Sequence, residues 1–422
     1  MKPYIHGVTA LVALAAFSTS LTAESLHGRW DAQLTIKDSV IPFRLDLSKK
    51  GSDFRATLYN GDIPQTTTRA TTGRDGVVLY FDHYLTKITA KETNGVLEGK
   101  VEGRFSADEY ITAVPFSAKR YQPPVLVAAD APVIEGLWEI PYESPKGEKA
   151  WRFIVKQTGP DVSAAILRVD GDTGSLTGAY RDGVFVLSHF DGSRPLRLEV
   201  TPKADGTLGL RLSGAYTPQK DLVALRPEAA RAKGFAPPVE FDAHTTVRDP
   251  NEKFTFRFPG VDGKVVSSDD PKFRGKVIVA IITGTWCPNC HDEAQYLVPL
   301  YKQYRDRGFE IVALDFEEPE QQDELARVKA FTQKYGVEYT YVIAGSPAEM
   351  WEKVPQAVNL NTWPATFFVD RSGKVRKIHP GFAAPASGKF HEELKAEFTA
   401  TIETLLAEKA TPETTTSARL ER

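Results

Sequence analysis

The chain has 422 residues, of which 41% are hydrophobic and 25% are charged, and its formal net charge is -3. This composition supports folded cores and excludes an intrinsically disordered chain. The near balance of charges gives no reason to expect nucleic acid as a partner. The length predicts more than one domain, since most domains have about 100–200 residues.

The N-terminus has the pattern of an export signal. Met1-Lys2 is followed by an apolar run from Val8 to Phe17 and by small residues up to Ala23. We expect residues 1–23 to be a signal peptide, which implies a periplasmic or other extracytoplasmic location. The alternative is an uncleaved N-terminal anchor that keeps the protein at the membrane.

Residues 24–122 and 133–228 have the pattern of two copies of one β-rich unit. Short motifs recur at a nearly constant offset: Gly28-Arg29-Trp30 as Gly136-Leu137-Trp138, Gly61-Asp62 as Gly171-Asp172, and Arg74-Asp75-Gly76-Val77 as Arg181-Asp182-Gly183-Val184. Apolar residues alternate with polar ones, which is typical of a sheet with one buried face. The Asp-Gly pairs predict hairpin turns. We therefore predict two repeated antiparallel β modules, each a small sandwich or barrel.

The pattern changes over residues 239–410. The continuous apolar run Val277–Ile282 predicts a central strand that is covered on both faces. Further strands are predicted at Phe309–Leu314, Tyr339–Ile343, Thr366–Val369 and Val375–Ile378, and helices from Ala294 to Tyr304, Glu320 to Tyr335 and Lys389 to Ala407. Strands that alternate with helices indicate an α/β domain. The polar residues 411–422 are expected to form a disordered tail.

The chain has two cysteines, which stand together in Cys287-Pro288-Asn289-Cys290. A disulfide across so short a loop would stabilise the fold little. A structural zinc site needs four ligands, and only His291 lies nearby in the sequence. The pair therefore indicates a redox role, with no metal and no cofactor.

Cys287 is expected where the strand ends and a helix begins. The partial positive charge and the free amides of a helix start favour the thiolate, which is the form that attacks a disulfide. Cys290 follows one turn later, so it can close a redox-active Cys287–Cys290 disulfide and release the reduced product. Pro288 suits the first helical turn.

The segment Gly284-Thr285-Trp286-Cys287-Pro288-Asn289-Cys290-His291-Asp292-Glu293 resembles the active site of the TlpA/ResA branch of thioredoxin-like proteins. The stretches Phe254–Phe256, Asp262–Val266 and Arg274–Val277 match the N-terminal hairpin of that family, and Trp363–Asp370 resembles its cis-proline segment. The resemblance is confined to the C-terminal domain. It implies a thioredoxin-like fold for residues 239–410.

The resemblance also implies roles for individual residues. Cys287 would be the nucleophile, Cys290 the resolving thiol and Glu293 the group that handles protons near the thiols. The substrate-binding residues would be Trp286, Trp363 and Pro364, with Pro364 in the cis form and Trp363 offering backbone hydrogen bonds to an extended substrate.

One departure and two alternatives affect these assignments. Thioredoxin has a buried aspartate where this chain has Ile281, so proton transfer would depend on Glu293 or on water. Glu293 has the alternative of being a solvated helix residue. His291 is expected to be an exposed surface residue, and the alternative is that it favours the thiolate.

These observations predict an exported thiol–disulfide oxidoreductase of the protein-disulfide reductase type. Its partners would be protein disulfides or dithiols. Since the chain has no third cysteine, an external electron donor is implied, such as a membrane thiol reductase. The direction of electron flow stays open.

Two other functions compete with this one. A thiol peroxidase, which would have antioxidant activity, needs a threonine three residues before its cysteine, and here Gly284 stands there. Alternatively, the β modules are the working part and bind a partner or a glycan. Because the modules have no cysteine, we expect them to select the partner and to take no part in the chemistry.

Overall fold

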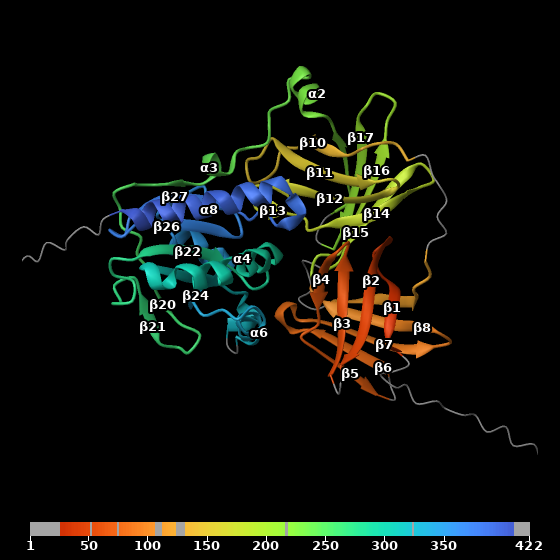
Figure 1. The fold of residues 1–422 in the computed structure, drawn as a ribbon, viewed down its shortest axis with the longest axis horizontal. Helices are drawn as coiled ribbons and strands as arrows, with labels where there is room; N and C mark the ends of the chain where they lie inside the picture. Colours follow the sequence, from red (N-terminus) through yellow and green to blue (C-terminus); the bar gives the residue numbers. More distant parts are fainter. Residues whose placement is uncertain are drawn as a thin grey trace, which may run out of the picture.

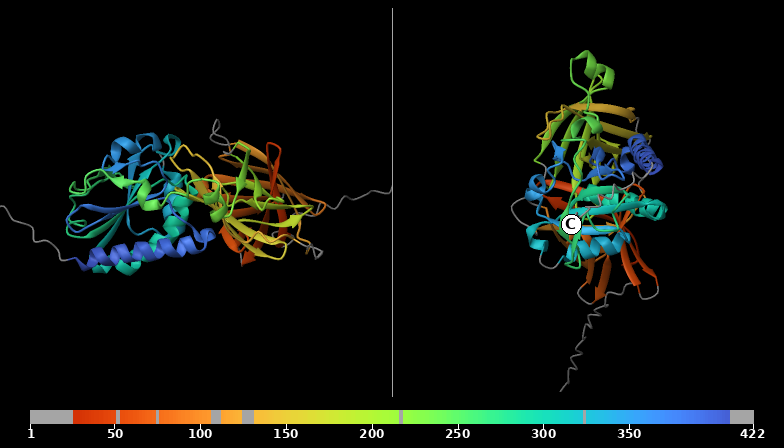
Figure 2. Two further views of the ribbon diagram at one scale, coloured as in Figure 1. Left: turned by 90° about the horizontal axis from the view of Figure 1, so that it is seen from above. Right: turned by 90° about the vertical axis from the view of Figure 1, so that its left-hand side faces the viewer.

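The computed structural model describes residues 26–50, 53–73, 76–105, 112–123, 131–215, 218–322 and 325–408. The expected signal peptide and tail lie outside these residues. The described chain forms two large antiparallel sheets that lie next to each other and a C-terminal α/β part that contacts both (Figure 1). Seen from above, the C-terminal part lies beside the two sheets (Figure 2).

The first β module is a nine-stranded antiparallel sheet with the order β4-β3-β2-β1-β9-β8-β7-β6-β5. Its strands are β1 Gly28–Ile36, β2 Ser39–Lys50, β3 Asp53–Asn60, β4 Ile63–Thr66, β5 Arg69–Gly73, β6 Gly76–Phe81, β7 Thr86–Thr93, β8 Val96–Gly103 and β9 Thr112–Arg120, and the short 3-10 helix η1 Asp82–Tyr84 follows β6. The alternating side chains of these strands bury one face, as in Trp30, Ala32 and Leu34 of β1.

The second β module has the order β10-β11-β12-β14-β15-β16-β17-β18, with β13 paired to β12. Its strands are β10 Gly136–Pro141, β11 Ala150–Thr158, β12 Asp161–Arg168, β13 Gly171–Asp172, β14 Leu176–Arg181, β15 Val184–His189, β16 Leu196–Pro202, β17 Leu208–Gly214 and β18 Lys220–Ala224. Glu139 and Leu225 exchange backbone hydrogen bonds of 2.8 and 2.9 Å. This exchange joins β10 to the end of β18 and closes the sheet into a barrel.

Both modules anchor their first strand in the same way. The indole N–H of Trp30 donates to the carbonyl four residues earlier at 3.0 Å, and that of Trp138 does the same at 2.8 Å. The guanidinium of Arg120 lies 4.0 Å from the Trp30 ring, and that of Arg226 lies 3.8 Å from the Trp138 ring. Each tryptophan is therefore a core residue with its polar group paired.

The hairpin turn expected at Asp182-Gly183 joins β14 to β15. Both residues have positive φ, 50° and 89°, and the flanking residues Arg181 and Val184 are paired across the strands. Two positive φ values in a two-residue loop match the twist of the strands and favour Asp-Gly. Asp75, in the turn expected of the first module, lies outside the described residues.

The C-terminal part contains a five-stranded sheet with the order β24-β23-β22-β26-β27. Its strands are β22 Val277–Thr283, β23 Phe309–Phe316, β24 Thr340–Gly345, β26 Ala365–Val369 and β27 Val375–Pro380. β22, β23 and β24 are parallel, whereas β26 and β27 are antiparallel additions. Every residue of β22 is buried, as its apolar run predicts.

Helices cover one face of this sheet. Residues of α4 Pro288–Tyr304, α6 Ala326–Tyr335 and α8 Lys389–Ala407 pack against it in one core cluster, which also contains Leu167 of β12. The other face is covered by Phe254, Phe256, Phe273 and the short helix α7 Met350–Lys353. The remaining elements are α2 Pro227–Ala232, α3 Phe241–His244, β19 Thr246–Val247, β20 Arg257–Pro259, β21 Val265–Ser267, α5 Pro319–Gln322, α7 Met350–Lys353, β25 Ala357–Val358 and the 3-10 helices η2 Arg305–Arg307, η3 Pro347–Glu349 and η4 Pro385–Ser387.

The single helix expected from Glu320 to Tyr335 is wrong. The structure has α5 and α6 in its place, and Leu325 between them has φ 51°, a left-handed conformation that an α-helix cannot continue through. Arg327, at the start of α6, is buried and pairs with Glu317 and Glu318 at 2.7 and 2.8 Å. Helical periodicity carries no signal for such a contact.

Candidate redox site

Cys287 lies at the junction where the sequence places it. It is the N-cap of α4, with the extended backbone angles φ -94° and ψ 114°, and Pro288 is the first residue of the helix. Its backbone N–H donates to the carbonyl of Gly284 at 3.0 Å, which shapes the turn after β22. Both cysteines are free thiols, and the exposed fractions are 5% for Cys287 and 1% for Cys290.

The two thiols have different acidities. Burial opposes the ionisation of Cys287, but hydrogen bonds from the Cys290 thiol and amide and the charge of Arg194 outweigh it, so the pKa of Cys287 is lowered. Burial, and then the hydrogen bond and charge of Cys287, raise the pKa of Cys290 well above its usual value. Cys287 is therefore the more acidic of the two thiols and the one that ionises first as the pH rises.

The three expected substrate-binding residues meet beside Cys287. The Trp363–Pro364 peptide bond is cis. The Cys287 thiol donates to the Trp363 carbonyl at 3.6 Å, and the ring centroids of Trp286 and Trp363 are 5.2 Å apart. The indole of Trp286 donates to the carbonyl of Phe316 at 3.0 Å, which fixes its orientation. The Trp363 carbonyl is thus next to the sulfur that a substrate would approach.

Glu293 is buried beneath the cysteines, with an exposed fraction of 1%. Its Oε1 accepts a hydrogen bond from Thr366, and its Oε2 has no hydrogen-bond partner among the described residues. Burial raises the pKa of Glu293 to about 8, which the Thr366 hydrogen bond opposes in part. The charge of Glu293 in turn contributes to the raised pKa of Cys290. The solvated-helix alternative is therefore wrong.

The expectation that His291 is exposed is also wrong. His291 is 1% exposed, and its ring nitrogens are 2.9 Å from the Tyr335 hydroxyl and 2.8 Å from the Thr285 carbonyl. Tyr84 of the first β module covers it, with the ring centroids 4.2 Å apart. Burial lowers the pKa of His291 to about 3, so the ring is neutral and gives the thiolate no charge.

The second β module contacts Asn289, one of the two residues between the cysteines. Arg194 Nη1 donates to Asn289 Oδ1 at 2.7 Å, and Asn289 Nδ2 donates to the Asp170 carbonyl at 2.7 Å. Arg194 Nη2 lies 3.4 Å from Asp292 Oδ2. The sequence analysis missed Arg194 and Asn289 and did not foresee that the second module contacts the redox motif. No local pattern marks a contact between residues so far apart in the chain.

A cleft of about 600 Å³ opens beside the redox motif. Its wall includes Tyr84 of the first module, Arg194 of the second module, and Trp286 and Pro288 of the motif itself. Access to this side of the motif is therefore shaped by all three parts of the chain.

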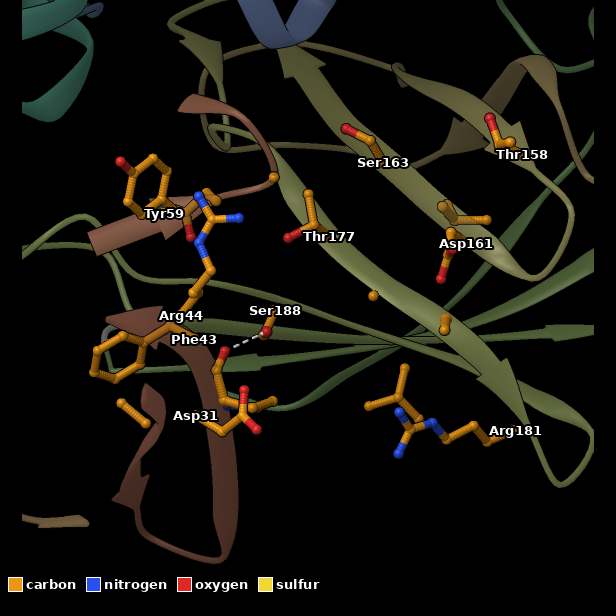
Figure 3. A pocket seen from close by; sticks show the side chains of 18 of the residues that line it. Asp31, Phe43, Arg44, Tyr59, Thr158, Asp161, Ser163, Thr177, Arg181 and Ser188 are labelled. Atoms are coloured by element: carbon orange, nitrogen blue, oxygen red, sulfur yellow. Dashed lines mark hydrogen bonds between the residues drawn. The ribbon is translucent and has the colours of Figure 1, made fainter. Parts of the chain in front are cut away.

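A larger cleft of about 1070 Å³ lies between the two β modules (Figure 3). Arg44 and Tyr59 come from the first module, and Asp161, Thr177 and Arg181 come from the second. Neither cysteine lines this cleft. Its wall combines apolar surface with charged and hydroxyl side chains, so it could receive a ligand without any redox chemistry.

A metal site does not emerge from the part of the chain that the structure describes. There, no group of three or more His, Cys, Asp or Glu side chains is arranged to hold a metal ion.

Comparison with known proteins places the C-terminal part among thioredoxin-like proteins. Residues 249–378 match the AhpC/TSA family. The thiol-disulfide oxidoreductase ResA of Geobacillus thermodenitrificans is 32% identical over 121 residues, which are 29% of this chain and 64% of that protein. ResA of Bacillus anthracis is 31% identical over 115 residues, 27% of this chain and 60% of that protein. The chain thus spans about six tenths of the length of these curated relatives.

Solved structures of the same kind are similar to this part of the chain. The thiol:disulfide interchange protein of Chlorobium tepidum TLS has 24% identity and a TM-score of 0.29, and the match covers 38% of this chain and 99% of that one. A thiol-disulfide oxidoreductase from Bacteroides fragilis has 18% identity and a TM-score of 0.27, over 34% of this chain and 99% of that one.

Proposed function

We propose that this chain is an exported thiol–disulfide oxidoreductase of the protein-disulfide reductase type. The observation that carries the proposal is the pair of thiols at the start of α4. Cys287 has a lowered pKa and a thiol hydrogen bond to the Trp363 carbonyl, whereas Cys290 behind it has a raised pKa. The match of residues 249–378 to the AhpC/TSA family and the 32% identity to ResA over 121 residues support the same chemistry.

The reaction proceeds by two exchanges. The Cys287 thiolate attacks one sulfur of the substrate disulfide, and the other sulfur leaves as a thiolate that takes up a proton. Cys290 then gives its proton to the carboxylate of Glu293 and attacks the Cys287 sulfur. This second exchange forms the Cys287–Cys290 disulfide and releases the second substrate thiol, so two electrons pass to the substrate.

The proposal includes a binding mode for the substrate and a source of electrons. Trp286, Trp363 and Pro364 would hold an extended segment of a protein disulfide against Cys287. The enzyme ends each cycle oxidised, and since its sequence has no third cysteine, an external dithiol must reduce it. A membrane thiol reductase is the donor expected for an exported protein, and no cofactor is required.

Export rests on residues 1–23, whose pattern is that of a signal peptide. No helix within the described ranges is long and apolar enough to cross a bilayer. We also infer that residues 24–122 and 133–228 are copies of one unit, because both have a tryptophan with the same indole hydrogen bond and an arginine over its ring.

Two cysteine variants of the full chain test the proposal. Cys287→Ser should abolish reduction of a disulfide substrate, and Cys290→Ser should accumulate a mixed disulfide between Cys287 and the substrate. Mass spectrometry of the trapped adduct identifies the sulfur. An adduct that forms in the Cys287 variant and not in the Cys290 variant would reverse the two roles, and activity in both variants would exclude the mechanism.

The cleft between the modules supports a second candidate function, which is binding of a partner or glycan by the β modules. A variant without either thiol separates the two functions. If the protein acts by binding a partner or glycan through its β modules, this variant keeps the biological role. If the protein acts through its redox centre, the variant loses that role.

A further inference from the structure

The guanidinium of Arg194 lies at the junction between the second β module and α4. Its Nη1 donates to Asn289 Oδ1 at 2.7 Å and to the Asp172 carbonyl at 3.1 Å. Its Nη2 lies 3.4 Å from a carboxylate oxygen of Asp191 and from one of Asp292. The side chain is only 17% exposed, so these contacts are largely shielded from water.

The loop that carries Arg194 is held in place before it meets the redox motif. Asp191 Oδ1 accepts the backbone N–H groups of Ser193 and Arg194 at 2.8 and 2.9 Å. Thr86 of the first module donates to the Gly192 carbonyl at 2.5 Å. Both β modules therefore fix the position from which Arg194 reaches α4.

Asn289 is held from a second side by the backbone of the same module. Its Nδ2 donates to the Asp170 carbonyl at 2.7 Å. Gly171 has φ +118°, and a Cβ there would lie 2.6 Å from Asn289 Nδ2 and 2.6 Å from the Phe382 carbonyl oxygen. Only glycine allows so close an approach with this backbone angle.

We propose that Arg194 is a positioning residue of the redox centre, through which the second β module holds Asn289 and sets the chemistry of Cys287. This inference rests on the proposed function. The cation favours the Cys287 thiolate, whereas the carboxylate of Asp170 disfavours it. Asp170 is paired with Lys146, and Arg194 shares its charge with Asp191 and Asp292. The module thus contributes charges of both signs to the centre.

The redox consequence follows from the thiolate. A group that stabilises the Cys287 thiolate stabilises the reduced enzyme, which makes the centre more oxidising. Loss of Arg194 should therefore make the reduction potential more negative and the thiol less reactive at neutral pH. Both are properties of the enzyme alone and need no substrate.

The test uses the full-length protein with Arg194→Gln, Arg194→Lys and the control Arg211→Gln. Arg211 belongs to the same module, and its exposed side chain pairs with Asp221 and Glu199. The readouts are the pH dependence of Cys287 alkylation and the potential from equilibration with glutathione buffers. Arg194→Gln should slow alkylation at pH 7 about two- to tenfold, with a midpoint at higher pH and a more negative potential. Arg194→Lys should lie between this variant and wild type.

Normal alkylation and potential in a folded Arg194→Gln protein would overturn the inference, as would an equal change in Arg211→Gln. Circular dichroism and thermal unfolding check the fold.

A second pair of variants leaves Arg194 in place. Gly171→Ala should change the alkylation of Cys287 because it displaces Asn289, whereas Gly183→Ala, also at positive φ but with no atom within 4 Å of the added Cβ, should change stability alone. Identical alkylation in both glycine variants counts against the inference. None of these readouts measures turnover. A protein that shows the expected alkylation and potential but does not reduce the chosen disulfide would therefore contradict the proposed function and not this inference.

Discussion

Thr366 on β26 and Glu293 on α4 are joined by a side-chain hydrogen bond beneath Cys290. The hydroxyl donates to one carboxylate oxygen, and the other oxygen has no hydrogen-bond partner among the residues that the structure describes. Glu293 therefore keeps an acceptor available for a proton in a buried site. This arrangement makes it the group to test for proton transfer during resolution of the mixed disulfide.

Turnover should rise with pH around the pKa of Glu293. Burial raises that pKa to about 8, so the carboxylate that we propose as the acceptor of the Cys290 proton becomes available only as the pH approaches this value. Glu293→Gln should lower kcat at least about tenfold and remove the inflection near pH 8 from the pH–rate profile. Glu392→Gln, on the exposed surface of α8, is the control. If the inflection near pH 8 persists in Glu293→Gln, it arises from the titration of a group other than Glu293.

Glu293 should also make stability depend on pH. Its pKa is 4.5 ordinarily and about 8 in the folded chain, so the folded protein retains a proton that the unfolded chain releases. This contribution is fully present below about pH 4.5 and is lost as the pH rises through about 8. Over this window the unfolding free energy of Glu293→Gln should therefore fall less than that of wild type, by a difference on the order of 5 kcal/mol. Urea unfolding at several pH values measures it, with Glu392→Gln as the control; parallel curves for Glu293→Gln and wild type would contradict the prediction.

Alkylation should distinguish the two thiols. At pH 7, iodoacetamide should modify Cys287 first, because its pKa is lowered while that of Cys290 is raised. Cys290→Ala removes the hydrogen bond that favours the Cys287 thiolate, so alkylation of Cys287 should slow several-fold in this variant. Peptide mapping identifies the modified residue. Preferential labelling of Cys290 in the wild-type chain would show that Cys290, and not Cys287, is the more acidic thiol.

Substrates should differ according to the flexibility of the chain around their disulfide. Cys287 is 5% exposed, and the cleft beside it has walls from all three parts of the protein. A disulfide in an unfolded peptide should therefore be reduced faster than the same disulfide in a folded domain. Tyr84→Ala should reduce this difference because Tyr84 forms part of the wall. Tyr59→Ala, in the cleft between the modules, is the control. Equal rates for both substrates with wild type would count against this restriction.

The sequence predicts those features that local patterns encode. The apolar run of β22, the helix start at Cys287 and the turn at Asp182-Gly183 each depend on a few neighbouring residues, and the structure has all three. The cis form of Pro364, expected from the resemblance, is present as well.

Features that depend on distant parts of the chain were missed. His291 is buried because Tyr84 of the first module lies over it, and the contact of Arg194 with Asn289 joins the second module to the redox motif. The break before α6 accompanies the pairing of Arg327 with Glu317. Periodicity and spacing describe one segment at a time, so they contain no information on which surfaces later meet.

Leu167 of the second module belongs to the same apolar cluster as the helices of the C-terminal sheet. When the chain is synthesised from its N-terminus, the strand that carries Leu167 exists before residues 277–405 do. The C-terminal core can therefore assemble on a surface that is already folded. The second module thus supplies part of the apolar surface against which the helices of the C-terminal part pack.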